Sequence, residues 1–412
     1  MSAEPLTRHW LIIAAMVLLS LPGIILRLTG THLEPVAGAA VFGIAILAAA
    51  FLLSWGAETA EMDISQGLAL AIIAIIAVLP EYAVDFVLAW KAGGSPEEAE
   101  KGLAIANMTG GNRLLIGVGW PIVFALFFFR TKLKELVVDR QRSLELAFLS
   151  VATLYVILIP LRHSVSVIDT IVLVTMFVLY LYFSSKVESE EVELVGPAKA
   201  MGALPDARRR TLVIVTLVFS AATIFASAEP FAESLVSIGE EFGVSEFLLI
   251  QWLAPLASES PEVLVAGLLA WRGRAAAGMG VLISSKVNQW TLLIGTLPVA
   301  FLLSAGDFSF TSGLPLDDRQ REEIFLTAAQ SAFAIAVFAN LRMGRKEAVA
   351  LFLLFATQLF ITSESIRLYY AAAYAVLCVI ILIVNRRELP ETANAAWNVL
   401  RGRSETEPRG VH

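Results

Sequence analysis

The chain contains one stretch of sequence twice, with acidic residues at matching places. In the first copy, Ile76-Ala77-Val78-Leu79-Pro80-Glu81 runs on to Leu88-Ala89-Trp90-Lys91. In the second copy, Ala257-Ser258-Glu259-Ser260-Pro261-Glu262 runs on to Leu269-Ala270-Trp271-Arg272, and both landmarks lie 181 positions after their counterparts. A repeat of this kind constrains the fold strongly, because the two copies must adopt the same local structure.

Later landmarks recur at nearly the same offset. Leu114-Leu115-Ile116-Gly117 returns as Leu292-Leu293-Ile294-Gly295, and Asp139-Arg140-Gln141-Arg142 returns as Asp318-Arg319-Gln320-Arg321. The offset stays near 180 throughout, so the duplication covers a whole structural unit. Duplicated apolar units that carry acids inside their helices are typical of secondary transporters.

The composition indicates that this chain is embedded in a lipid bilayer. Of the 412 residues, 57% are hydrophobic and only 16% are charged, which excludes an ordinary soluble protein. Stretches long enough to cross about 30 Å of hydrocarbon as helices lie near 10–26, 36–55, 66–90, 101–129, 143–161, 165–184, 211–228, 244–271, 275–303, 322–341, 346–363 and 368–385. We therefore expect an all-α polytopic membrane protein with about 12 transmembrane helices.

The repeat sorts these spans into domains. We expect an extra N-terminal transmembrane helix, two five-helix repeats joined by a cytoplasmic linker, and an extra C-terminal helix with a cytoplasmic tail. The corresponding ranges are 1–35 for the N-terminal helix, 36–184 for the first repeat, 185–210 for the linker, 211–363 for the second repeat and 364–412 for the C-terminal part.

The basic residues predict the orientation of the spans. With the N-terminus inside, 21 basic residues fall on the cytoplasmic side and 7 on the outside, a clear positive-inside bias. Both termini are then cytoplasmic. An odd number of spans in each repeat turns the second copy upside down, so the two Asp-Arg-Gln-Arg segments fall on opposite sides of the membrane. We therefore predict two repeats of inverted topology.

Several charged residues lie within the apolar spans themselves. Each costs roughly 2.5–3.5 kcal/mol at a helix centre on insertion scales, so as a group they must face one another, water or a bound ion. The six are Glu81, Asp85, Arg113, Glu259, Glu262 and Lys286.

The prolines beside the acids predict local helix breaks. Glu81 and Asp85 are four residues apart and share a helix face. Pro80 and Pro261 directly precede Glu81 and Glu262, and proline removes a backbone donor and frees a carbonyl. Broken helices at mid-membrane expose carbonyls that can coordinate a cation, and oxygen ligands suit hard ions such as Ca²⁺. An isolated proline can also be a plain kink, and an isolated acid can be a structural ion-pair partner.

The next span in each copy carries amides, hydroxyls and small residues. The first copy reads Ala106-Asn107-Met108-Thr109-Gly110-Gly111-Asn112-Arg113, and the second reads Ile283-Ser284-Ser285-Lys286-Val287-Asn288-Gln289. Small residues allow another helix to approach closely, which is a packing role. Alternatively, the amides and hydroxyls offer ligands opposite the acids, which makes Asn107, Asn112, Ser258, Ser285 and Asn288 candidates for ion binding.

With these motifs, the sequence resembles the calcium/cation antiporter superfamily, which includes the sodium/calcium exchangers. Members carry two inverted repeats, each with a Gly-Thr-Ser-x-Pro-Glu helix and a Gly-Asn-x-x-Gly-Ser-Asn-x-x-Asn helix. The resemblance covers roughly 36–363 and implies ten core helices, a mid-membrane ion site and alternating access. By position, Glu81 and Glu262 correspond to the paired ion-binding glutamates, which would be the metal ligands, and Ser258 and Ser285 to a motif threonine and serine. Gly110-Gly111-Asn112 matches the Gly-Ser-Asn of the first copy, although alignment on Leu-Leu-Ile-Gly sets Asn107 opposite Ser285.

The departures from the family motifs bear on the mechanism. Ala77 and Val78 replace the Thr-Ser pair of the first copy, and Glu259 replaces the motif serine of the second. Lys286 takes the place of a ligand asparagine, and Arg113 adds a second base, so both would compensate charge or take part in coupling. Four acids against two bases leave a charge of about −2, enough to hold one Ca²⁺ or two protons. We hypothesise that sodium sites are lost and that protons do the coupling.

The sequence therefore predicts a secondary active cation antiporter that exchanges Ca²⁺, or a similar cation, for Na⁺ or H⁺. A sodium/proton antiporter and a non-transporting relative that keeps the fold are the alternatives. An enzyme is not expected, because no His-Glu-x-x-His motif or nucleophile–base pair is evident. The single cysteine, Cys378, and four scattered histidines predict no disulfide and no histidine metal site. We expect no cofactor and no nucleic-acid partner, only the lipid bilayer and transported cations, in a prokaryotic cytoplasmic membrane.

Overall fold

The structure is a computed structural model that describes residues 6–60, 62–63, 78–186, 194–307, 309–310, 312–359 and 364–401. The first half contains the helices α1 (Leu6–Thr29), α2 (Pro35–Ala60), α4 (Leu79–Gly94), α5 (Pro96–Glu100), α6 (Leu103–Leu114), α7 (Trp120–Thr131), α8 (Ser143–Val156) and α9 (Val167–Ser184). The second half contains α10 (Ala198–Gly202), α11 (Asp206–Phe242), α12 (Glu246–Trp271), α13 (Ala275–Asn288), α14 (Ile294–Ala305), α15 (Asp318–Val337), α16 (Arg345–Gln358), α17 (Glu364–Val384) and α18 (Leu389–Leu400).

The helices account for the predicted spans. Ten helical segments in the described part of the chain are long and apolar enough to cross a membrane. Of the two other predicted spans, the one near 66–90 begins among residues 64–77, which the structure does not describe. The other is α16, whose 14 residues extend roughly 21 Å at 1.5 Å per residue. The predicted fold class, an all-α polytopic membrane protein, is confirmed.

Two short antiparallel ladders demonstrate the inversion of the repeats. β1 (Glu135–Val137) of the first repeat pairs with β4 (Arg342–Gly344) of the second. β2 (Ser164–Ser166) pairs with β3 (Gly313–Pro315). β1 follows α7 in the first repeat, and β3 follows α14, the counterpart of α7, in the second. In the same way, β2 follows α8 and β4 follows α15. Exchanging the two repeats therefore turns the β1–β4 ladder into the β2–β3 ladder. Each ladder joins the two copies at one end of the bundle, as inverted topology requires.

A second shared feature lies in the middle of two long helical segments. α6 continues into α7 through a π-helical turn at Leu115–Gly119, and α13 continues into α14 through one at Gln289–Leu293. Such π-helical turns shift the helix register and occur frequently at functional sites. Both directly follow the amide-rich segments that the sequence identifies as candidate ligands.

The predicted helix break at Pro261 is wrong. α12 runs without interruption from Glu246 to Trp271, with Pro255 and Pro261 inside it. Membrane helices tolerate proline where neighbouring groups or local adjustments satisfy the freed carbonyl. Pro80 instead lies in the first turn of α4, where proline is favoured because its missing donor has no helical partner anyway. Residues 64–77, which include Ala77, lie outside the described part of the chain.

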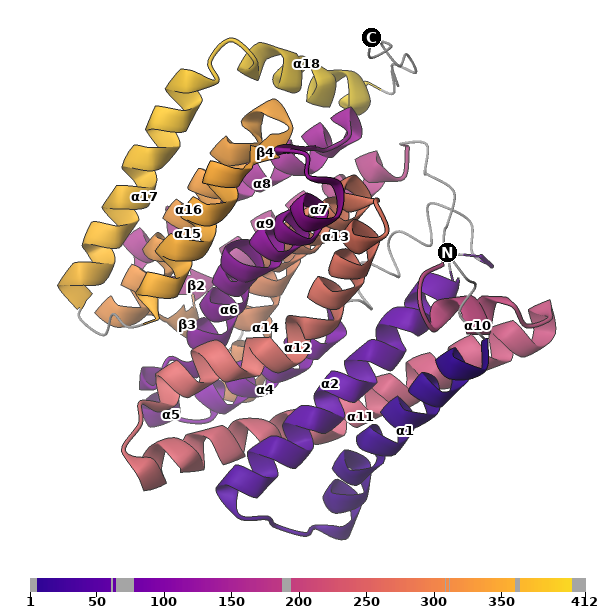
Figure 1. Cartoon of the computed structure of the whole chain (residues 1–412). Helices are drawn as coiled ribbons and strands as arrows, with labels where there is room; N and C mark the ends of the chain where they lie inside the picture. Colours follow the sequence, from indigo (N-terminus) through magenta and orange to yellow (C-terminus); the bar gives the residue numbers. More distant parts are fainter. Residues whose placement is uncertain are drawn as a thin grey trace.

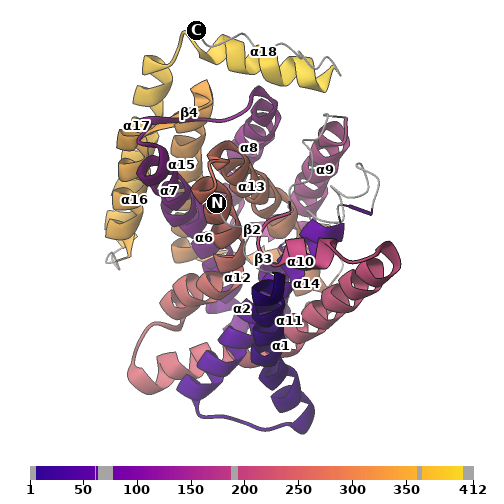
Figure 2. The same cartoon turned by 45° about the vertical axis from the view of Figure 1, so that its right-hand side comes forward.

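α1, α2 and α11 form a bundle on one side of the molecule, and α17 and α18 lie on the other (Figures 1 and 2). Small residues allow the close approach within this bundle. A Cβ at Gly23 of α1 would collide with Ser227 of α11, and one at Gly43 of α2 would collide with Phe231 of α11. The extra N-terminal helix therefore packs on one helix from each repeat.

α6 and α12 cross at Gly110, and this crossing is sensitive to side-chain size. Pro255 frees the Gln251 carbonyl from its helical hydrogen bond, and the oxygen of this carbonyl lies only 1.8 Å from the position that a Cβ on Gly110 would take. We expect Gly110→Ala to lower the free energy of unfolding by about 1–3 kcal/mol, as other overpacking changes do. Thermal unfolding in detergent measures this loss. Gly94→Ala is the control, because nothing lies within 4 Å of its added Cβ; equal effects of both substitutions would contradict the prediction.

An ion-pair cluster joins the end of α2 to the beginning of α11. Asp63 accepts hydrogen bonds of 2.8 Å from Nε and Nη2 of Arg209 and one of 2.9 Å from Arg210. The hydrogen bonds from Arg209 lower the pKa of Asp63 below its ordinary value. α11 begins at Asp206, within the segment that the sequence predicts as a linker.

This cluster predicts a pH dependence of stability. Because the pKa of Asp63 is lower in the folded state, its contribution is complete above the unfolded value of about 3.9 and is lost as the pH falls through the folded value. We expect Asp63→Asn to lower the melting temperature by the same amount between about pH 5 and 8, with a gap to the parent that narrows below about pH 4. Melting curves over this range measure the gap. A gap that widens on acidification would contradict the assignment.

Candidate functional site

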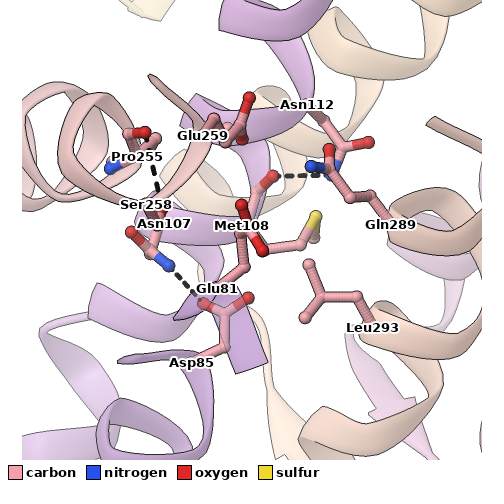
Figure 3. A pocket seen from close by; sticks show the side chains of 11 residues that line it. Glu81, Asp85, Asn107, Met108, Asn112, Pro255, Ser258, Glu259, Gln289 and Leu293 are labelled. Atoms are coloured by element: carbon pink, nitrogen blue, oxygen red, sulfur yellow. Dashed lines mark hydrogen bonds between the residues drawn. The ribbon is translucent and has the colours of Figure 1, made fainter. Parts of the chain in front are cut away.

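A pocket opens where helices of both repeats meet near the π-helical turns (Figure 3). α4 and α6 of the first repeat and α12 and the α13–α14 segment of the second contribute its walls. Its lining residues are Glu81, Asp85, Asn107, Met108, Gly111, Asn112, Pro255, Ser258, Glu259, Gln289 and Leu293. Six of the residues that the sequence singles out therefore lie around one pocket: Glu81, Asp85, Asn107, Asn112, Ser258 and Glu259.

α4 supplies two of the carboxylates. Glu81 lies in its first turn and Asp85 one turn later, so both face the pocket, and both are buried. Asn107 of α6 donates a hydrogen bond of 2.8 Å from Nδ2 to Asp85 Oδ1. Among the described residues, neither carboxylate oxygen of Glu81 has a hydrogen-bond partner. Asp85 is thus held in place, whereas Glu81 is available for a ligand.

α12 supplies a third carboxylate from the second repeat. Glu259 is fully buried, and neither of its oxygens has a hydrogen-bond partner within the described part of the chain. Oε1 would collide with a Cβ on Gly111 of α6, at 2.3 Å, so a glycine at this position allows the carboxylate to reach the pocket. Ser258 beside it bonds back to the carbonyl of Ala254 at 3.3 Å. A hydroxyl that bonds to its own helix can turn to a ligand at small cost.

Glu262 lies next to the pocket but is not among its lining residues. It is buried on α12, three residues beyond Glu259, and its charge acts on both Glu81 and Glu259. Ser285 of α13 lies close to it. In the described part of the chain, the Glu262 oxygens make no hydrogen bond. Glu81 and Glu262, the motif glutamates of the two repeats, are therefore close enough for their charges to interact, although only Glu81 lines the pocket in this conformation.

Lys286 is the base at this site. Its fully buried ammonium donates a hydrogen bond of 2.6 Å to Asn112 Oδ1 and one of 3.4 Å to the Asn112 carbonyl, and lies 4.2 Å from the centre of the Trp290 ring. It also acts electrostatically on Glu259. A fixed positive charge in a site of carboxylates and amides occupies a position that a small cation could otherwise take.

Asn288 makes a contact outside the pocket that the sequence did not predict. Its Oδ1 accepts a hydrogen bond of 2.9 Å from the Tyr82 hydroxyl of α4, and it does not line the pocket. This contact ties the end of α13 to the helix that carries Glu81 and Asp85. Gln289, the next residue, does line the pocket, although it is not among the candidates predicted from the sequence. Its position directly after Asn288, in an amide-rich segment, is the signal that could have revealed it.

The expected role of Arg113 in compensating the pocket carboxylates is not what its contacts show. Its guanidinium forms an ion pair of 2.5 Å with Glu323 of α15 and lies 5.0 Å from the centre of the Trp252 ring. Arg113 follows Asn112 on α6, and one residue rotates the side chain by about 100° about the helix axis, away from the pocket. Glu323 could not be recognised as a buried partner from the sequence, because it lies near the start of a span, where acids usually face water.

This pairing changes the charge of the site. With Arg113 balanced by Glu323, the carboxylates of Glu81, Asp85, Glu259 and Glu262 face Lys286 alone among the residues that the structure describes, which gives these five side chains a formal charge of −3 when all are ionised. Among the described residues, no three acidic, histidine or cysteine side chains could by themselves hold a metal ion. A cation in this pocket would therefore also need amide, hydroxyl or backbone oxygens, such as those of Asn107, Asn112, Ser258 and Gln289.

Comparisons with known proteins agree with this architecture. The sequence profile of the family described as sodium/calcium exchanger protein matches residues 34–186 and 212–364. A crystal structure of the H⁺/Ca²⁺ exchanger CAX is 43% identical, with a TM-score of 0.91, covering 96% of this chain and 100% of that one. Native YfkE is 16% identical with a TM-score of 0.62, covering 90% and 100%. The sodium-calcium exchanger NCX_Mj is 18% identical with a TM-score of 0.52, covering 79% and 98%. The latter two share the fold. Among curated protein sequences, none matches.

Proposed function

We propose, from the premise that the chain belongs to the sodium/calcium exchanger protein family, that this integral membrane cation antiporter exchanges Ca²⁺ for protons at the pocket between its two repeats. The observation that carries the proposal is the set of buried carboxylate oxygens without hydrogen-bond partners among the described residues, on Glu81 and Glu259. Buried ionised carboxylates are costly unless they are paired. A transported cation or bound protons would provide the missing partner.

The chemistry of the donors favours Ca²⁺ as the transported cation. Carboxylate, amide and hydroxyl oxygens are the ligands of hard cations, and Ca²⁺ accepts flexible geometries with six to eight oxygens. In our proposal Glu81 and Glu259 bind the ion from the pocket wall, Glu262 joins them in another conformation of the transport cycle, and Asp85 is positioned by Asn107. Asn112, Ser258 and Gln289 supply neutral oxygens, with Ser285 beside Glu262. Asn288 supports the site through Tyr82.

Lys286 is the reason for proposing protons as the coupling ion. Its ammonium is fixed on Asn112 and would compete with a sodium ion for the same oxygens. When Ca²⁺ leaves, the remaining charge of the carboxylates is uncompensated in a medium of low dielectric constant, and proton binding removes that cost. The 43% identity to the H⁺/Ca²⁺ exchanger CAX supports the same coupling ion.

We further propose the orientation and the domain division. The positive-inside bias of the sequence places both termini in the cytoplasm, and the basic segment around β1 and β4 would lie on that side. The chain would be divided into the repeats 36–184 and 211–363, with the linker 185–210 and the additional parts 1–35 and 364–412; the matched ranges 34–186 and 212–364 support these boundaries. The membrane would be a prokaryotic cytoplasmic membrane.

Flux measurements in proteoliposomes test the coupling. We expect uptake of ⁴⁵Ca²⁺ when a proton gradient is imposed, little uptake under an equal sodium gradient, and loss of uptake when nigericin collapses the proton gradient. Uptake that depends on sodium alone would overturn proton coupling. Proton-coupled ²²Na⁺ flux without Ca²⁺ flux would identify a sodium/proton antiporter, and the absence of any flux would identify a non-transporting relative.

A further inference from the structure

Beside the pocket, a second group of buried charges joins α6 to α15 and to the C-terminal helix α17. We propose that Glu323, which Arg367 of α17 holds in place, is a positioning residue for cation binding: its carboxylate balances the Arg113 charge, so that this charge does not weaken the cation site. The inference rests on the proposed function, because it assigns these residues to the affinity of the same site. It also gives the extra C-terminal helix a part in transport.

The buried cluster consists of Arg113, Glu322, Glu323 and Arg367, in which acids and bases alternate as counter-ions. Glu323 Oε2 lies 2.5 Å from Arg113 Nη2, and Glu323 Oε1 accepts a hydrogen bond of 2.9 Å from Arg367 Nη1. The three residues are 1–5% exposed. Glu322 lies 3.8 Å from Arg367 Nε. Two acids and two bases make the cluster neutral as a whole, whereas each base alone would be an uncompensated charge in the membrane interior.

Further contacts fix the Arg113 side chain in this place. Its Nη1 donates a hydrogen bond of 3.3 Å to Gln358 Oε1 of α16, and Gln358 in turn donates one of 2.6 Å to the Tyr374 hydroxyl of α17. Gln330 of α15 donates to the Arg113 carbonyl at 3.2 Å. The face of Trp252 covers the guanidinium. Helices from the second repeat and from α17 thus enclose an arginine that belongs to α6 of the first repeat.

The cluster is electrostatically connected to the pocket. Arg113 directly follows Asn112, which lines the pocket and accepts the hydrogen bond from Lys286. The charge of Arg113 acts on Lys286. Arg113 without Glu323 would therefore add an unbalanced positive charge close to a site that has to attract a divalent cation. At an effective dielectric constant of about 20, an unbalanced unit charge this close to the site weakens the binding of a divalent cation by roughly tenfold or more.

α17 is the element that closes this arrangement. The family profile ends at residue 364, and α17 begins there, so Arg367 and Tyr374 come from a helix outside the matched repeats. Arg367 shares Glu323 with Arg113 and compensates the acid pair of α15. The extra helix therefore contributes charge to the cluster in addition to apolar packing.

Substitutions with opposite expected signs test the proposal. We expect Glu323→Gln to raise the Kd for Ca²⁺ and the KM for ⁴⁵Ca²⁺ uptake about tenfold, with kcat within about threefold of the parent. Arg113→Gln should leave the Kd unchanged or lower it, and the double variant Arg113→Gln with Glu323→Gln should restore it to near the parental value. Calorimetric titration of purified protein with Ca²⁺, at fixed pH and ionic strength, gives the Kd values, and melting curves report folding.

Glu145→Gln is the matched control. Glu145 is buried near the start of α8, the first-repeat counterpart of α15, and pairs with Arg142 at 2.8 Å. We expect it to lose stability without a change in Kd. A purely structural role of Glu323 predicts that Glu323→Gln and Arg113→Gln move the Kd in the same direction, or not at all, and either result overturns the inference. If the Glu323→Gln variant does not fold, the Arg113→Gln variant decides alone: an increased Kd for Ca²⁺ in that variant overturns the inference. If the parent does not bind Ca²⁺, the proposed function fails and this inference with it.

Discussion

Replacement of both Glu81 and Glu262 by glutamine is expected to lower ⁴⁵Ca²⁺ uptake into proteoliposomes by roughly a hundredfold or more, while the protein keeps its fold. Loss of one partner of a buried charge interaction costs about 3–5 kcal/mol, and every 1.4 kcal/mol is a factor of about ten in binding. Glutamine keeps the shape of the side chain but removes the charge that Ca²⁺ has to find in the pocket. Both residues are buried and interact electrostatically.

The control for this experiment removes the same number of acids elsewhere. Glu135 of β1 and Glu233 of α11 are exposed, and they pair with Arg342 of β4 and Lys91 of α4. The variant with Glu135→Gln and Glu233→Gln should transport within about twofold of the parent, since exposed ion pairs contribute little. Size-exclusion profiles and melting curves show whether each variant is folded. A folded Glu81→Gln, Glu262→Gln variant with parental uptake would contradict the assignment of the site.

Replacement of Lys286 by alanine is expected to change the coupling ion. The substitution removes the ammonium that Asn112 holds at 2.6 Å and leaves four carboxylates without a base. Proton-driven ⁴⁵Ca²⁺ uptake should fall about tenfold or more, because the loss of a buried charged partner costs several kcal/mol. The vacated oxygens should bind a monovalent cation, so sodium-dependent Ca²⁺ uptake should appear. Parallel flux assays under imposed sodium and proton gradients measure both effects.

Lys91→Ala is the matched control for this substitution. Lys91 lies in the last turn of α4, is partly exposed and pairs with Glu233 at 2.7 Å, so its removal should alter neither the rate nor the coupling ion. Transport by the parent that is driven by sodium alone, together with an unaffected Lys286→Ala variant, would reject the proton-coupled mechanism. A Lys286→Ala variant that unfolds would show instead that the charge is needed for assembly, which the melting curve reveals.

The large features of the fold could be predicted because they depend on short, contiguous stretches of sequence. Apolar stretches of the length of a bilayer give the spans, and landmarks such as the two Pro-Glu segments give the repeat. The ladders β1–β4 and β2–β3 agree with the inversion deduced from the basic residues. The family profile covers both halves.

The site was harder to predict, because its geometry depends on contacts between distant segments. The spacing of Glu81 and Asp85 indicates a shared helix face, and both line the pocket. In contrast, the continuous α12 through Pro261 depends on the packing of neighbouring helices around it. The pairing of Arg113 with Glu323 joins residues 210 positions apart, and no local pattern records it.

The register of the later helices also could not be predicted from the sequence. Alignment on Leu-Leu-Ile-Gly and alignment on the acidic motifs differ by about a turn. In the structure, the π-helical turns follow Leu114 in the first copy and Asn288 in the second. Such turns insert an additional residue into the helix, and this shift decides which amides face the pocket. Gln289, which lines the pocket, was overlooked for this reason.

Calcium titration of the purified protein tests most directly whether carboxylates of the two repeats share one cation. Calorimetry at two pH values, in two buffers with different enthalpies of ionisation, measures both the bound Ca²⁺ and the released protons. The account predicts one Ca²⁺ per chain, weaker binding at the lower pH, proton release on binding, and no binding by the Glu81→Gln, Glu262→Gln variant. Calcium binding of equal affinity in that variant, or binding without proton release at both pH values, would contradict it.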